Sequence, residues 1–125
     1  MIQKIDHMVI TTKNPAAIIS FYETIGFLSR EQNNRIELFV GDFKINVHTL
    51  GQELLPCAKN VQIGCNDFCF EVEERIEQVY DSLLENGVPL ESEIVTRHGV
   101  RGQMKSIYLR DPDGNLIELS SYELK

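Results

Sequence analysis

The stretch RDPDGNLIEL, residues Arg110–Leu119, decides how the C-terminal part of the chain folds. Its centre, Asp111–Gly114, is a strong turn signal, because Asp side chains cap turns, Pro presets φ and Gly accepts a positive φ. The flanking segments Met104–Arg110 and Asn115–Tyr122 carry the apolar and β-branched residues that favour strands. The sequence therefore predicts a β-hairpin here.

Glu118 lies between two apolar residues in the second strand of this hairpin. Successive side chains of a strand point to opposite faces, so Glu118 points away from the helices if Ile117 and Leu119 pack against them. A carboxylate in such surroundings is costly to bury unless it is paired or bound to a metal. We therefore expect Glu118 to face a central cavity; an exposed carboxylate on a half-solvated sheet is the alternative.

The rest of the chain repeats one order of elements. Apolar periodicity and turn residues predict a strand, a helix and three strands in each half, and His7 falls on Asp67 when the halves are superposed. This predicts an α+β fold, in which two βαβββ modules form a curved mixed sheet around a central cavity. We expect one domain over residues 1–125, with modules of roughly 1–52 and 65–125 and a linker at 53–64. The further predicted elements are strands Ile2–Thr12, Phe27–Glu31, Arg35–Val40, Phe43–Leu50, Asp67–Val72 and Val88–Thr96, helices Pro15–Ile25 and Glu73–Asn86, and a loop Arg97–Gln103.

Charge and composition exclude several classes of partner. The 125-residue chain has a formal net charge of −7 and no basic run, so neither nucleic acid nor an anionic membrane surface is an expected partner. No apolar run is long enough to cross a membrane, and the chain begins without the features of a secretory signal, so we expect a cytoplasmic protein. The three cysteines lack a Cys-x-x-Cys spacing, and we expect them to be small buried residues.

Four stretches together resemble a known family. They are IDHMVITT at residues 5–12, FYETIGF at 21–27, FKINVHTLG at 43–51 and RDPDGNLIELSSY at 110–122. They resemble the vicinal oxygen chelate superfamily, which includes glyoxalase I, extradiol dioxygenases, fosfomycin-resistance enzymes and bleomycin-binding proteins. The resemblance covers essentially the whole chain. It implies paired βαβββ modules, often in a dimer, with metal ligands on the first and last strands of each module.

The resemblance implies particular metal ligands. The family's first ligand falls on His7 and its last on Glu118, which we also take as the catalytic residue. Asp67 stands where many members have His, and it is a ligand, a hydrogen-bond partner or a solvated residue. The second ligand is open: alignment with the strand of Glu118 gives Asn46, whereas counting back from the strand end gives His48.

We favour His48 as the second ligand, because imidazole binds transition metals better than a carboxamide does. Two imidazoles and one carboxylate suit ferrous iron, and they also suit manganese, nickel or zinc. The expected cofactor is therefore a divalent metal ion of open identity. We assign substrate contacts to Asn46, Tyr108 and the loop residues Arg97 and His98, whose charges suit an anionic substrate. The two glycines of that loop suggest a flap over the cavity, with a solvated hairpin loop as the alternative.

The sequence leaves two functions open. The first is a metal-dependent enzyme, dioxygenase-like or lyase/isomerase-like, acting on a small organic substrate with vicinal oxygens. The second is a metal-free protein that sequesters a small drug or metabolite, as in the bleomycin-resistance branch. A catalytically silent scaffold is a third reading, because a fold does not fix a function. We favour the enzyme, and we expect a homodimer because the small sheets leave edge strands exposed.

Overall fold

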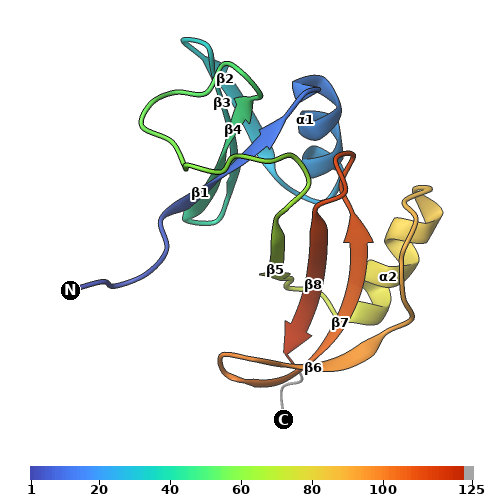
Figure 1. Ribbon diagram of the computed structural model, residues 1–125. Helices are drawn as coiled ribbons and strands as arrows, with labels where there is room; N and C mark the ends of the chain where they lie inside the picture. Colours follow the sequence, from blue (N-terminus) through green and yellow to red (C-terminus); the bar gives the residue numbers. More distant parts are fainter. Residues whose placement is uncertain (123–125) are drawn as a thin grey trace. The chain divides into compact units, whose positions relative to one another are not determined.

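The computed structural model of the protein describes residues 1–122 and divides into two compact units. The first unit contains Met1–Cys65 and the much later turn Asp111–Gly114. The second contains Asn66–Arg110 and the described residues from Asn115 on. Each unit has one four-stranded mixed sheet and one helix (Figure 1), which confirms the predicted α+β fold of two βαβββ modules.

The first module consists of β1 (His7–Thr12), α1 (Pro15–Thr24), β2 (Leu28–Gln32), β3 (Arg35–Val40) and β4 (Phe43–Thr49). The strands lie in the order β1-β4-β3-β2, with β1 and β4 parallel and the other neighbours antiparallel. α1 begins as predicted, because the Asn14 side chain accepts a hydrogen bond from the Ala17 N–H at 3.2 Å and Pro15 occupies the first turn.

α1 covers one face of this sheet. Ile18 and Tyr22 on the helix are fully buried, as are Leu38 and Ile45 on the strands. Burial of each such side chain stabilises the fold by about 1.5–3 kcal/mol. Because side chains alternate along a strand, this core turns the side chains of His7, Val9 and Thr11 toward the opposite, open face.

The second module consists of β5 (Asp67–Glu71), α2 (Ile76–Glu85), β6 (Val95–Gly99), β7 (Gly102–Arg110) and β8 (Leu116–Tyr122). Its strands lie in the order β5-β8-β7-β6, with β5 and β8 parallel, so it repeats the topology of the first module. α2 packs on β7 and β8 (Figure 1). Ile76, Ile107 and Ile117 form the centre of this core and are at most 1% exposed.

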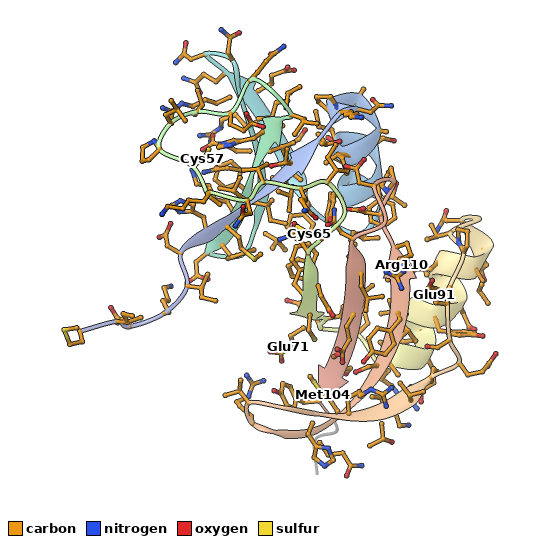
Figure 2. The ribbon with its side chains drawn as sticks, in the orientation of Figure 1. Cys57, Cys65, Glu71, Glu91, Met104 and Arg110 are labelled. Atoms are coloured by element: carbon orange, nitrogen blue, oxygen red, sulfur yellow. The ribbon has the colours of Figure 1, made fainter. Side chains whose placement is uncertain are left out.

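The segment before β6 corrects one prediction. The predicted strand Val88–Thr96 is wrong, since residues 88–94 are irregular and the strand begins at Val95. Pro89 cannot donate to a ladder, and the segment is instead attached to β7 at single points. The Glu91 N–H donates to the Tyr108 carbonyl at 2.8 Å, and the Glu91 carboxylate pairs with the Arg110 guanidinium at 3.0 Å (Figure 2).

The predicted loop Arg97–Gln103 is also wrong, because this segment is the tip of a tight hairpin joining β6 to β7. Gly99 pairs with Gly102 across the strands, and only two residues form the turn. Gly99 lets the Tyr122 side chain pack closely, since an added Cβ would lie 2.3 Å from the Tyr122 hydroxyl. Arg101 anchors the tip through an ion pair with Glu71 at 2.8 Å. Gly99 therefore permits close packing, and Gly102 adopts the positive φ of 125° beside the turn, so the segment is the hairpin that was the alternative to a flap.

The first strand begins at His7, whereas the prediction began it at Ile2. The cysteines, predicted to be buried, are free and exposed at Cys57, Cys65 and Cys69. Within residues 1–122, no helix is both long and apolar enough to cross a membrane.

Candidate functional site

The open face of the first sheet carries the polar residues that the sequence selected from this module. β1 and β4 pair in parallel, with His7 opposite Lys44, Val9 opposite Asn46 and Thr11 opposite His48. His7, Asn46 and His48 therefore share the face opposite the α1 core. The same alternation places Asp67, Glu118 and Tyr108 together on the open face of the second sheet, because Glu118 is paired with Cys69 on one side and Tyr108 on the other.

His7 is oriented by its neighbour in sequence. Its Nδ1 donates to the Asp6 carboxylate at 2.8 Å. This hydrogen bond is the main cause that lowers the pKa of Asp6. A carboxylate on one ring nitrogen fixes the tautomer of the imidazole and leaves the other nitrogen for a ligand, an arrangement typical of metal-binding histidines.

The strand registers of the two modules are the same. Lys44 is opposite His7, and Asn46 lies two residues beyond it. In the second module Leu116 is opposite Asp67, and Glu118 lies two residues beyond. Each module thus presents one polar pair, His7 with Asn46 and Asp67 with Glu118, whose members are displaced by roughly 7 Å along the strands.

The same register makes His48 the counterpart of Ser120 rather than of Glu118. His48 lies four residues beyond Lys44, which is the partner of His7. The backbones of the two histidines are therefore roughly 13 Å apart along the strand direction. That separation strains any arrangement in which both bind one ion. The geometry therefore favours Asn46 over His48 as the equivalent of the Glu118 ligand position.

Glu118 is half-buried and held by hydroxyl groups. Its Oε2 accepts hydrogen bonds from Ser106 at 2.7 Å and from Ser120 at 3.1 Å. The two hydroxyls also contact one another at 2.6 Å, and Ser120 contacts the Cys69 sulfur at 3.2 Å. Although Cys69 as a residue is exposed, partial burial of its sulfur raises the pKa of the thiol, which makes it a poor nucleophile. The cluster thus orients a carboxylate.

Tyr108 and Arg97 form a second polar group on this face. Arg97 Nε donates to the Tyr108 hydroxyl at 2.9 Å, and the guanidinium carbon lies 5.4 Å from the centre of the ring. His98 is the next residue along β6 and pairs with Gln103, so its side chain lies on the opposite face. The structure therefore brings Arg97 to the open face with Glu118 and leaves His98 off it.

A pocket of about 80 Å³ opens in the first unit, at the end of β4. Asn46 and His48 line it, together with Arg35 from the start of β3 and Gln52 and Leu54 from the segment after β4. Asn46 Oδ1 and His48 Nδ1 are buried and lack a hydrogen-bond partner among the described residues. Buried polar atoms of this kind normally have partners, so the pocket is shaped for a polar group.

Several of these residues were missed from the sequence. The role of Asp6 could have been predicted from the sequence, since it directly precedes His7. Ser120 had a weaker signal, because it lies two residues after Glu118 and so shares its face. Ser106 and Arg35 had none, because their places depend on strand register. Within residues 1–122, no three His, Cys, Asp or Glu side chains form a group that would hold a metal ion.

Comparison with known proteins shows the family. A profile of the glyoxalase/bleomycin resistance protein/dioxygenase superfamily matches residues 4–119. The chain belongs to this superfamily. This membership confirms the resemblance found in the sequence, and it accounts for the two repeated modules.

Members of this superfamily with similar sequences come from bacteria and fungi. Virulence protein STM3117 of Salmonella typhimurium is 40% identical over 124 residues, or 98% of this chain and 86% of that protein. Its crystal structure superposes with a TM-score of 0.95 at 38% identity, covering 98% of this chain and 99% of the other. Glyoxalase domain-containing protein RDO1 of Mycosarcoma maydis is 39% identical, covering 98% of this chain and 70% of that protein. Metallothiol transferase FosB of Shouchella clausii is 29% identical, covering 95% and 80%.

Proposed function

We propose that this protein is a metal-dependent enzyme whose substrate is a small organic molecule with two neighbouring oxygens. The observation that supports this best is the pair of equivalent positions, His7 with Asn46 and Asp67 with Glu118, on the open faces of two modules of the same register. The superfamily membership and the similarity to a protein named a metallothiol transferase add weight. The reaction is either dioxygenase-like or lyase/isomerase-like.

We assign the divalent metal to His7 and Glu118, with Asp67 as a further ligand. Each donor is supported in its own module, because Asp6 holds the His7 ring in one orientation and hydroxyls hold one oxygen of Glu118. When bound, such an ion supplies Lewis acidity toward substrate oxygens. His48, which the sequence favoured as a ligand, we assign to substrate instead.

The remaining residues position the substrate in this proposal. The Tyr108 phenol, fixed by Arg97, lies beside Glu118 across β7 and β8 and offers a hydrogen bond to a substrate oxygen. Asn46 and His48 present unpartnered polar atoms from the first module. His98 has no role here, because its side chain lies on the other face of β6.

Metal analysis tests this proposal. Protein purified without chelators should carry a stoichiometric amount of a divalent metal, measured by plasma mass spectrometry. His7→Ala and Glu118→Gln should each lower the metal content strongly. His98→Gln is the matched control and should leave it unchanged. Failure to load the wild-type protein with any divalent metal would contradict the proposal.

A metal-free sequestering protein is the second candidate, and one observation favours it. The first module has an amide, Asn46, where the second has the carboxylate Glu118, and an amide is a weaker metal ligand. Binding of a flat, cationic aromatic compound to metal-stripped protein, measured by calorimetry, would favour this candidate. Binding that requires the metal would exclude it.

We also propose a homodimer. The first strand of each module, β1 or β5, ends its sheet, so its outer edge presents backbone groups that a second copy can satisfy. Light scattering coupled to size-exclusion chromatography should give twice the mass of the chain. A single-chain mass at micromolar concentration would contradict the dimer.

A further inference from the structure

The pocket at the end of β4 has a chemical character that the family membership does not explain. Its lining combines a cation, Arg35, with the amide of Asn46 and the imidazole of His48. Among the described residues that line the pocket, none is an Asp or a Glu. In a chain with a formal net charge of −7, such a pocket is a local exception.

The nearest carboxylates have other partners. Glu37, on the face of Asn46, forms an ion pair with Lys44 at 2.5 Å. Glu53, whose charge acts on His48, accepts a hydrogen bond from the Gly51 N–H at 2.9 Å. The Arg35 charge also attracts Glu37, but neither Glu37 nor Glu53 lines the pocket. A guanidinium is always charged and presents donors that match a carboxylate or a phosphate.

The two unpartnered atoms define the second requirement. Asn46 Oδ1 is an acceptor and needs a donor, and His48 Nδ1 serves as donor or acceptor. An occupant that carried only an anionic group would satisfy Arg35 and leave Asn46 Oδ1 unpaired. Leaving a buried acceptor without a partner costs on the order of a tenfold loss in affinity or more.

We propose that this pocket binds a small hydroxycarboxylate, with its carboxylate on Arg35 and its hydroxyl between Asn46 and His48. The volume of about 80 Å³ admits a group of a few heavy atoms. A single guanidinium matches one negative charge, which favours a carboxylate over a phosphate dianion in this acidic protein. The proposal rests on the proposed function in one respect: the hydroxycarboxylate is taken to be one end of the enzyme's substrate, and the first module recognises that end.

Titration of metal-free protein with glycolate tests the pocket without the metal. The full chain, stripped with chelator, is followed by amide NMR at constant ionic strength. Glycolate should shift the amides of β4 around Asn46 and His48. Arg35→Gln should weaken this binding by roughly tenfold or more, since a charge-assisted pair is lost. Arg30→Gln is the matched control, because Arg30 lies over Phe39 outside the pocket, and it should bind as the wild type does.

Comparison of three anions tests the assigned chemistry. Glycolate should bind several-fold more tightly than acetate, which lacks the hydroxyl, and more tightly than inorganic phosphate. Equal binding of acetate, a preference for phosphate, or equal glycolate binding by wild type and Arg35→Gln would each overturn the proposal. Amide spectra of the variants confirm that they fold. Glycolate binding by a protein that takes up no metal would refute the proposed function alone, and metal uptake without glycolate binding would refute the pocket alone.

Discussion

At the scale of single residues, the environment of Glu118 explains how a carboxylate can lie half-buried on a sheet. Its Oε2 accepts two hydroxyl hydrogen bonds, from Ser106 and Ser120, within one cluster. Hydrogen bonds to a charged acceptor are about twice as strong as neutral ones and fix its orientation. Because both bonds go to the same oxygen, they leave Oε1 as the atom available to a metal or substrate.

Ser106→Ala tests this role of the hydroxyls. The substitution removes one bond to Glu118 and keeps the strand, so metal affinity should fall by roughly tenfold or more, as for other residues that orient a ligand. Ser121→Ala, on the opposite face of β8, should leave the affinity unchanged. The measurement is a competition titration with a metal-binding dye, and equal affinities of the two variants would contradict the role assigned to Ser106.

At the scale of elements, the sequence predicted the strands and helices with strong periodicity and failed where tertiary contacts decide. Helix α1 and the strand Arg35–Val40 were predicted closely, because Asn14-Pro15 and the turn residues mark their ends. The β6–β7 hairpin was only the alternative prediction for Arg97–Gln103, and the strand residues within that segment were not predicted, because Gly99 approaches Tyr122, which is far away in the sequence. The place of His48 was uncertain, because the equivalence of His48 with Ser120 depends on strand register.

The turn between β2 and β3 gives a prediction at this scale. Asn33 and Asn34 have φ of 54° and 61°, the left-handed values of the hairpin turn that favours Asn and Gly. Asn33→Gly should therefore keep or slightly raise the free energy of unfolding, whereas Asn33→Ala should lower it by about 1 kcal/mol. Urea unfolding followed by circular dichroism measures both. Equal stability of the two variants would show that the turn does not constrain the chain.

At the scale of the whole molecule, the turn that the sequence predicted most clearly, Asp111–Gly114, also makes a contact that the sequence did not predict. Asp111–Gly114 joins β7 to β8 of the second unit, yet its residues belong to the first. The Tyr22 hydroxyl of α1 donates to Asp111 Oδ2 at 2.8 Å, and both residues are buried. The DPDG motif and the FY of α1, two of the stretches that carried the family resemblance, therefore meet in one buried contact. Their spacing of 89 residues hides this from any local pattern.

Tyr22→Phe tests how far this contact stabilises the protein. Loss of the bond to a buried carboxylate should lower the free energy of unfolding by about 1–3 kcal/mol, measured by urea unfolding at pH 7. Tyr80→Phe, which removes a longer and more exposed hydroxyl contact with Glu93, is the control and should change it little. Burial raises the pKa of Tyr22, so above its ordinary value of 10.0 the phenol ionises in the unfolded chain but stays neutral in the folded one. The wild type should therefore lose part of its advantage over Tyr22→Phe as the pH rises above 10.0. A difference that is absent at pH 7, or that grows at alkaline pH, would mean that the hydroxyl does not hold the turn.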